Sequence, residues 1–526
     1  MKPPPAMTAM PVRSVAPPAG VPALPAKPAL EIELKLAVPE AARAAVRRRL
    51  NAYGKQPPLK VASVYFDTPD RRLASKHAAL RIRRIGEAAG AQWIQTLKTD
   101  DNPGALSHRG EWETAVAGPR PQLAGLAEWP LQQVLGEEPV RLLPVFRTRF
   151  ERTVRSVRYR GALIELGLDE GQIIAGRRSE PVCEIELELR EGSPSSAFDL
   201  ALELIGRDRR ALALLPSIES KASRGYRLAQ RLGEQPVHAD AAGFSSLLQP
   251  QRTHLDVARR IVAHGVHLVL ANARGAALGE DLEYVHQARV ALRRTRSALR
   301  VLGVARAADD PIARDLRWMA DCFGAARDWD VLVSETLPLL GKAIAAADDT
   351  RWSALIERAQ ARRQRQQQRL RATLGSARFA RAALRLLQWA EEPAASTPTP
   401  LTPRARRVIE RGHQRLTAAA RDLAKLPPQG RHRLRILTKR QRYALELLAP
   451  LLSAGASART LKLLSRLQQL LGQINDAHVT VSMLPTLTRS RELVQRAERW
   501  SEKVVRRNLP KAQARLERLR KHGSGV

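Results

Sequence analysis

The sequence predicts an α+β protein of two domains, with a strand-rich domain first and an all-helical domain after it. Between about residues 30 and 227, apolar residues mostly alternate with polar ones, which is typical of antiparallel strands. Beyond about residue 250, apolar residues recur at helical spacing to the end of the chain. The length of 526 residues is sufficient for two or three hydrophobic cores.

Changes of composition divide the chain. The opening residues are rich in Pro and Ala, and prolines interrupt every apolar run, so we predict a disordered tail rather than a signal peptide. A Pro-rich stretch after Glu391 separates two halves of the helical region. The predicted segments are a tail (1–29), a strand domain (30–228), a linker (229–250) and a helical domain (251–522), whose halves span about 251–390 and 404–522.

The net charge of +36 is concentrated in the helical domain. From residue 251 onward there are 52 Lys and Arg against 24 Asp and Glu, a net charge of +28. The first 250 residues carry the remaining +8. This imbalance indicates a polyanionic partner for the helical domain.

Cysteine usage and hydropathy point to the cytoplasm. Cys183 and Cys322 lie far apart in the sequence and have no metal-ligand spacing, so a disulfide framework is not expected. No run of about 18 apolar residues stands out, and we therefore predict no membrane span.

Charged residues alternate onto one face of single strands in the first domain. They are Glu31, Glu33 and Lys35 in EIELKL, Arg81 and Arg83 in LRIRRI, and Glu184, Glu186 and Glu188 in CEIELEL. A solvated sheet face would explain such alternation without any function. Three carboxylates in a row repel one another unless a cation lies between them, and carboxylate oxygens favour Mg²⁺ or Mn²⁺. Arginines facing the same space would hold a phosphorylated substrate through paired hydrogen bonds.

The order of these motifs resembles the CYTH superfamily, the triphosphate tunnel metalloenzymes. The matches, in family order over about residues 30–228, are Glu31-x-Glu33-x-Lys35, YFDT at Tyr65 to Thr68, Arg81-x-Arg83, Lys98, the acidic pair of RGEWE, Asp169, EIELEL and Ser220-Lys221. The resemblance implies an antiparallel eight-stranded β-barrel with a hydrophilic tunnel, in which a metal ion assists hydrolysis of a phosphoanhydride.

The resemblance also implies roles for individual residues. The implied ligands of Mg²⁺ or Mn²⁺ are Glu31, Glu33, Asp169, Glu184, Glu186 and Glu188, and the catalytic candidates are Glu31, Glu33 and Lys35. The implied substrate-binding residues are Lys35, Arg81, Arg83, Lys98, Lys221 and one of Arg149 and Arg152. Arg149 and Arg152 have opposite parity, so only one of them points inward in a regular strand. Few aromatic residues are available to stack on a base or a thiamine ring, which favours inorganic triphosphate.

The helical domain carries one basic pattern twice. HQARVALRRTR, from His286, and HRLRILTKRQR, from His432, have basic residues at the same offsets of 3, 7, 8 and 10. Comb 1 consists of His286, Arg289, Arg293, Arg294 and Arg296, and comb 2 of His432, Arg435, Lys439, Arg440 and Arg442. Like charges at such spacings destabilise an isolated helix by roughly 0.2–0.5 kcal/mol per pair. Repeating them in register favours a bound polyanion over a solvated helix face.

A second motif follows each comb. Gly324-x-x-x-Asp328 comes after comb 1 and Gly472-x-x-x-Asp476 after comb 2, with offsets of 146 residues between the combs and 148 between these motifs. An internal duplication explains the repeated order, and it predicts two similar helical bundles related by pseudo-symmetry. Asp328 and Asp476 are expected to pair helices and orient the arginines.

These helical motifs resemble the CHAD domain, the conserved histidine α-helical domain, over about residues 250–520. The segments that carry the resemblance are VHQARVALRRTR, GAARDWDVL, HRLRILTKRQRYALELL and LLGQINDAHV. The resemblance implies two pseudo-symmetric four-helix bundles with a basic groove, in which the two combs bind inorganic polyphosphate.

Together the two resemblances predict a cytoplasmic, metal-dependent inorganic triphosphatase that binds polyphosphate and associates with polyphosphate granules. Two alternatives stay open: a non-catalytic granule scaffold, and a CYTH enzyme of the thiamine-triphosphatase or class IV adenylate cyclase type. Nucleic acid is expected only as a non-specific competitor, because the chain is 4% aromatic and single-strand binders stack bases on aromatic side chains.

Overall fold

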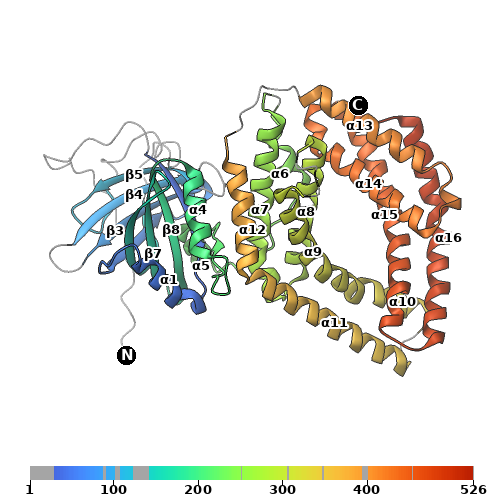
Figure 1. Ribbon diagram of the computed structural model, residues 1–526, viewed down its shortest axis with the longest axis horizontal. Helices are drawn as coiled ribbons and strands as arrows, with labels where there is room; N and C mark the ends of the chain where they lie inside the picture. The colour runs from blue at the N-terminus through green and yellow to red at the C-terminus, as the bar shows by residue number, and fades with distance from the viewer. Residues whose placement is uncertain are drawn as a thin grey trace. The chain divides into compact units, whose positions relative to one another are not determined.

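The computed structural model has a strand unit and a helical unit, and the predicted succession of an antiparallel sheet and a helical region is confirmed (Figure 1). The structure describes residues 29–86, 91–100, 107–122, 135, 141–249, 251–304, 307, 309–345, 349–393, 401–452 and 454–524. The strand unit comprises the chain up to Gln235 together with residues 376–391, and the helical unit comprises the rest. The predicted tail, residues 1–29, lies outside the described residues except for Ala29.

One antiparallel sheet forms the strand unit, in the order β5-β4-β3-β2-β6-β7-β8-β1-β9. The strands are β1 Ala29–Ala37, β2 Leu59–Asp67, β3 Ala78–Ile85, β4 Gln92–Asp100, β5 Ser107–Ala115, β6 Leu143–Tyr159, β7 Ala162–Ala175, β8 Arg178–Glu191 and β9 Leu215–Pro216. β1 also pairs with β5, so the strands from β1 to β8 form a closed ring. Closure pairs the two strands that would otherwise be sheet edges.

The alternating sequence of each strand separates polar from apolar side chains. In β1, Leu34 and Leu36 are fully buried on the outer face, while Glu33 and Lys35 point into the ring. Helix α4 (Pro194–Ile205) contacts β1 and β8 with Phe198 at its fully buried centre. The sequence defines where this helix begins, because Ser193 is its N-cap and Pro194 occupies the first helical position.

Helix α12 (Ala377–Glu391) packs against α4 and β9 in the strand unit. Arg381 donates to the carbonyl oxygen of Gly206 at 2.8 Å, and Gln388 donates to Asp199 at 2.9 Å. The sequence-based division placed residues up to about 390 in the helical domain, whereas the structure groups this helix with the sheet. An amphipathic pattern predicts a buried face but does not identify the element that covers it.

Helix α5 (Lys221–Gln230) packs against β6 and β7 and places Lys221 at its first position. Ser220 caps the helix by accepting a hydrogen bond from the backbone of Ser223 at 3.0 Å. Gly225 lies directly against the ring of Phe146, where an added Cβ would be 2.1 Å from Cε2. Glycine therefore permits the close approach that positions Lys221. The described part of this unit also contains helix α1 (Arg43–Asn51) and the short helix α2 (Arg72–Ser75).

The helical unit consists mainly of long helices joined by short connections. They are α6 Ala241–Ser245, α7 His254–Leu278, α8 Leu282–Leu302, α9 Pro311–Val331, α10 Leu337–Ala343, α11 Thr350–Leu374, α13 Leu401–Ala419, α14 Pro428–Leu448, α15 Ala454–Met483 and α16 Arg491–His522. The two halves meet where α8 packs against α14, and again in an apolar cluster that joins Leu355 to Leu484 and Leu493. The duplicated halves therefore share part of their core.

Helix α7 is long and apolar enough, by length and composition, to cross a membrane. Of its most apolar 18-residue window, 61% is buried inside the protein. A core helix of a folded unit passes the same test, and the partners of α7 include α8 and α11. Cys183 and Cys322 form no disulfide.

Replacing Gly225 by Ala is expected to destabilise the strand unit by about 1–3 kcal/mol, because the new methyl group overlaps the Phe146 ring. Urea unfolding followed by tryptophan fluorescence measures the change. Gly118→Ala is the matched control, since no atom lies within 4 Å of a Cβ at Gly118. Equal stability of the two variants would show that α5 does not depend on this close contact.

Candidate functional site

A cavity of about 360 Å³ lies inside the ring of strands, and most of the predicted tunnel residues line it. Its charged lining residues are Glu33, Lys35, Arg81, Arg83, Lys98, Glu111, Glu113, Arg152, Glu165, Glu186, Glu188, Arg190 and Lys221. They come from strands that neighbour one another around the ring and from the start of α5. The period-two alternation delivers them to a common interior although they are far apart in sequence.

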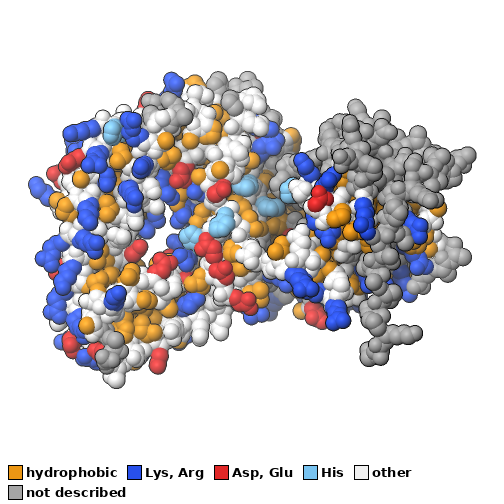
Figure 2. Space-filling view, turned by 180° about the vertical axis from the view of Figure 1, so that it is seen from behind, with side chains coloured by type: hydrophobic (Ala, Val, Ile, Leu, Met, Phe, Trp, Pro, Cys, Tyr) orange, Lys and Arg blue, Asp and Glu red, His pale blue; other side chains and the backbone are white. Residues whose placement is uncertain are grey.

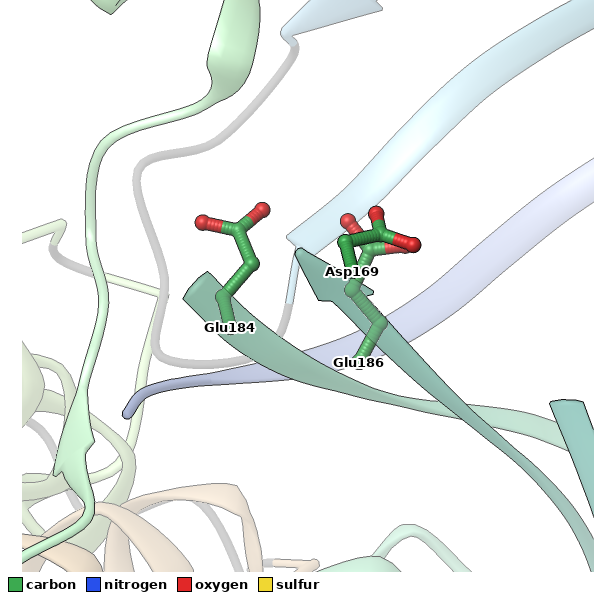
Figure 3. Close-up of side chains that lie close together, drawn as sticks. All are labelled: Asp169, Glu184 and Glu186. Atoms are coloured by element: carbon green, nitrogen blue, oxygen red, sulfur yellow. The ribbon is translucent and has the colours of Figure 1, made fainter. Parts of the chain in front are cut away.

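One wall of the cavity is backed by three acidic residues of β7 and β8, namely Asp169, Glu184 and Glu186 (Figure 3). One oxygen of each carboxylate lies within 4.8 Å of the others, a spacing that could hold a metal ion. Lys221 occupies their centre, with its Nζ 2.6 Å from Asp169 and Glu184 and 2.7 Å from Glu186. The three donors of an ammonium group are thereby satisfied.

Arg152 closes the same cluster from β6. Its Nε and Nη2 donate to the two oxygens of Asp169 at 2.6 Å each, and Nη2 also bonds Glu186. Lys35 lies 2.7 Å from Glu33 and 3.0 Å from Glu186. Fixed cations therefore neutralise carboxylates that were predicted to bind metal.

The pKa values of this cluster show how strongly the charges depend on one another. Burial opposes the charge of Lys221, but Asp169 and Glu184 raise its pKa well above the ordinary value. Burial likewise opposes the charge of Glu186, yet Lys221 and Lys35 hold its pKa well below the usual range. Both groups are thus charged at neutral pH, and a metal ion would have to displace a buried ammonium to enter here.

A second acidic group faces the cavity directly. Glu33 of β1 lies opposite Glu188 of β8, and Glu188 lies opposite Glu165 of β7. Arg190 pairs with Glu188 at 2.5 Å and with Glu165 at 3.2 Å, and its side chain is 47% exposed. This arginine can move into solvent at far smaller cost than Lys221, whose side chain is 8% exposed. Oxygen donors with a displaceable counter-charge suit a hard divalent cation, so Glu165 and Glu188 could exchange Arg190 for a metal more easily than the buried cluster could exchange Lys221. Glu33 lies beside them but is held by the buried Lys35 at 2.7 Å.

Sequence reasoning missed Glu165 and Arg190. The signal for Glu165 was its parity, because it shares a face with Asp169 in GALIELGLD. The other acid of the predicted signature, Glu31, pairs its backbone with Arg109 of β5, and its side chain lies outside the described residues.

Cations predominate across the cavity from these acids. Arg81 lies 3.5 Å from Glu111 and 3.8 Å from Glu113, and Lys98 lies 3.0 Å from Glu111. Arg83 has no ion pair within the described parts of the chain. Burial, followed by repulsion from Arg81 and Arg152, lowers its pKa to about 10. An anion bound at Arg83 would relieve this repulsion.

Tyr65 is a further cavity residue whose role the sequence did not reveal. It is buried, its ring stacks on Phe146 with centroids 4.4 Å apart, and it pairs with Arg81 across β2 and β3. Although burial alone would raise it, the pKa of the Tyr65 hydroxyl is lowered by Arg81 and Arg83. The hydroxyl thus lies in the positive field of the cavity, where it can donate a hydrogen bond to an anion.

The structure decides between the two arginines of β6. Phe146, Thr148 and Phe150 are buried, and Arg152 continues their parity into the cavity. Arg149 lies on the exposed outer face of the strand. Of the two alternatives, Arg152 therefore lines the cavity, and the register of β6 turns the side chain of Arg149 away from it.

In the helical unit, the two combs lie on α8 and α14, which pack against each other. Tyr443 lies buried between them. The guanidinium carbons of Arg293, Arg294 and Arg442 are 5.1, 5.3 and 4.9 Å from its ring centroid. These contacts bring cations of both combs together around one aromatic ring.

Equivalent positions of the two combs make similar contacts. Arg289 of comb 1 lies 2.9 Å from Asp328, and Arg435 of comb 2 lies 3.8 Å from Asp476. His432 contacts Asn475, the neighbour of Asp476, at 2.7 Å. The acidic residue of each Gly-x-x-x-Asp motif thus lies beside the equivalent arginine of its comb.

Lys439 shows the resulting accumulation of positive charge. Burial, followed by repulsion from Arg435 and from Arg293 and Arg289, lowers its pKa to about 7. The pKa of His286 is also lowered, by burial and by Arg327. Lys and Arg side chains are spread over much of the face of the helical unit that Figure 2 shows. A polyanion would stabilise this arrangement by supplying the missing negative charge.

Two family models match the chain, the CYTH domain over residues 29–226 and the CHAD domain over residues 260–485. The chain therefore carries a CYTH domain followed by a CHAD domain. The cavity lies in the CYTH domain, and both combs lie in the CHAD domain.

Known proteins resemble each part. An inorganic triphosphatase from Haemophilus influenzae is 32% identical over 208 residues, which are 38% of this chain and 55% of that protein, so the chain spans about half of that relative. The crystal structure of a CHAD domain from Ricinus communis is 28% identical and covers 54% of this chain and 97% of its own, with a TM-score of 0.47. A Hippeastrum protein, named for an adenylyl cyclase and a dominant triphosphatase activity, is 23% identical over 34% of this chain and 86% of its own, with a TM-score of 0.26.

Replacing Lys221 by Met is expected to destabilise the CYTH domain by about 3–5 kcal/mol, because three buried carboxylates lose their shared counter-charge. Millimolar Mg²⁺ should restore part of the loss by taking the place of the ammonium. Thermal unfolding with and without Mg²⁺ measures both effects, and Lys76→Met, at an exposed position, is the control. A variant that is destabilised but does not respond to Mg²⁺ would exclude metal binding at Asp169, Glu184 and Glu186.

Proposed function

We propose that the CYTH domain hydrolyses inorganic triphosphate with Mg²⁺ or Mn²⁺, and that the CHAD domain binds inorganic polyphosphate. The observation that carries the first part is one cavity with cations on one side and, on the other, carboxylates whose counter-charge, Arg190, is displaceable. The closed ring of β1 to β8 supports the architecture this requires, an eight-stranded barrel whose interior is a tunnel.

The cations of the cavity suit a chain of phosphates. Arg81 and Arg83 present guanidinium groups that can hold phosphate oxygens by forked hydrogen bonds, and Lys98 adds a point charge. Tyr65 and Tyr226 are the aromatic residues among those that line the cavity. Tyr65 already stacks on Phe146, and Phe146 also contacts Tyr226 edge-on, so neither ring is placed to receive a base. This favours inorganic triphosphate over ATP and thiamine triphosphate.

Glu165 and Glu188 would hold the divalent cation, with Glu31 and Glu33 as further candidates. The cation would polarise a phosphoryl oxygen and lower the pKa of a bound water. The protein residues bind and orient the substrate: Arg81 and Arg83 neutralise charge on the transferring phosphoryl group. Lys35 lies between Glu33 and Glu186, where it fixes the carboxylates beside the substrate.

The buried set of Arg152, Lys221, Asp169, Glu184 and Glu186 is assigned a supporting role. Their mutual ion pairs hold β6, β7, β8 and α5 together at the acidic wall. Arg152, Lys221 and Glu186 still line the cavity, so they contribute to its field as well as to its shape.

The combs of the CHAD domain suit a polymer of phosphates that lacks bases. Arg289, Arg293, Arg435 and Lys439 gather where α8 meets α14. Tyr443 is covered by three guanidinium groups, so it does not offer a free ring to a nucleic-acid base. We infer a cytoplasmic protein that associates with polyphosphate granules through this surface.

Purified protein is expected to release phosphate from inorganic triphosphate with Mg²⁺ or Mn²⁺ and to act far more slowly on ATP and thiamine triphosphate. Glu31→Ala/Glu33→Ala and Arg83→Gln should each lower kcat/KM by about 100-fold, because they remove metal ligands and a phosphate contact. Arg149→Gln is the matched control for Arg83→Gln, since Arg149 lies on the outer face. A wild-type rate no higher than that of Glu31→Ala/Glu33→Ala would leave the granule scaffold as the better account.

Lys439→Met is expected to bind polyphosphate about tenfold more weakly at pH 6 and yet to be more stable than the wild type at that pH. Below pH 7 the lysine is protonated in both states, and its charge is unfavourable in the folded protein. Between about pH 7 and its ordinary pKa of 10.5, the unfolded state binds more protons, so wild-type stability rises with pH and the difference disappears.

Urea unfolding at pH 6 and pH 10 and titration with polyphosphate measure the two effects of Lys439→Met. Lys462→Met, at an exposed position of α15, should change neither. A variant with weaker binding and lower stability at pH 6 would identify Lys439 as a packing residue rather than a binding residue.

A further inference from the structure

The contacts between the two comb helices should occur in equivalent pairs, because the helices arose by duplication. One such contact joins Arg294, at offset 8 of α8, to Glu446, at offset 14 of α14, with Nη1 and Oε2 2.6 Å apart. Glu446 also pairs with Arg442 at 3.5 Å. If the two helices are equivalent, offset 8 of α14 should meet offset 14 of α8 in the same way. These positions, counted from His432 and His286, are Arg440 and Arg300.

At this second position both partners are cations. Arg296 and Arg300 are one turn apart on α8, and the packing of α8 on α14 with the equivalent Arg294–Glu446 contact puts Arg440 beside Arg300. Desolvation, followed by repulsion from Arg440 and Arg296, lowers the pKa of Arg300 to about 10, in agreement with this placement. Arg300 and Arg440 remain accessible to solvent, and neither has an ion pair among the residues that the structure describes. The acidic group that faces Arg296 is Asp321, and Arg317 opposes its effect.

We propose that Arg296, Arg300 and Arg440 bind a phosphate group of a polyanion at this end of the combs. The inference rests on the proposed binding of polyphosphate by the CHAD domain and adds a direction to it. At one end Glu446 neutralises Arg294 and Arg442 and repels phosphate. At the other end three guanidinium groups lack that carboxylate and offer forked donors to phosphate oxygens.

A phosphate chain on the combs therefore extends beyond the end of comb 1 and stops where comb 2 meets Glu446. The two comb helices are similar, but the position after comb 2 carries a glutamate, Glu446, where the position after comb 1 carries an arginine, Arg300. Because each unpaired guanidinium gains more from an anion than a paired one, the added affinity should come from the Arg300 end. The alternative is that Arg300 and Arg440 are only solvated by water, in which case replacing either of them would not change the affinity for polyphosphate.

Arg300→Glu tests the inference with little risk to the fold, because it recreates at this position the ion pair that Arg294 and Glu446 form at the other. The affinity for inorganic polyphosphate of defined chain length, measured by calorimetry at several salt concentrations, should fall about tenfold. The slope of log K against log salt concentration should decrease by about 1. Arg440→Glu would pair with Arg300 and should give the same result.

Arg365→Glu, at an exposed position of α11, makes the same change of net charge and should alter the affinity less than twofold. If Arg300→Glu and Arg440→Glu bind as Arg365→Glu does, while Lys439→Met still weakens binding, this inference is overturned and polyphosphate binding stands. If the wild type does not bind polyphosphate, both fail. Thermal unfolding of each variant separates a loss of binding from a loss of fold.

Discussion

Charges of one sign held at short range determine how both domains are built. In the CYTH domain, buried carboxylates from β7 and β8 are brought together only because Lys221 and Arg152 lie between them. In the CHAD domain, the cations of α8 and α14 converge with far fewer counter-charges. The charges of the first arrangement are balanced within the protein, whereas the second has an excess of cations that the proposed polyanion would neutralise. This difference separates a structural charge cluster from a binding surface, although both look alike in a list of charged residues.

The fold class and most cavity residues followed from the sequence, because a two-residue period fixes which side chains share a face. Arg152 and Arg149 show the limit, since parity requires one to face inward but the strand register decides which. Glu165 was missed although it shares the parity of Asp169, because its place opposite Glu188 appears only when β7 pairs with β8. Lys221 was expected to bind substrate, and its partnership with three carboxylates depends on how closely α5 approaches β6.

The repeat in the helical region could also be predicted from the sequence, because the basic residues of the two combs have the same spacing. The difference in charge between the two ends of the combs could not be predicted. Arg300 and Glu446 occupy the same offset after their combs, yet only the packing of α8 on α14 shows what each one meets. A repeated motif thus predicts which positions are equivalent, but only the tertiary contacts show whether residues at these positions have the same function.

Helix α12 has a consequence for the order in which the protein can be made. The sheet and α4 precede residue 235, but the helix that packs on α4 and β9 is not synthesised until residue 391. During translation, the face of α4 that α12 covers therefore stays uncovered while the 140 residues of the helical unit from 236 to 375 leave the ribosome. The strand unit is thus built from two segments of the chain that are separated by part of the helical unit.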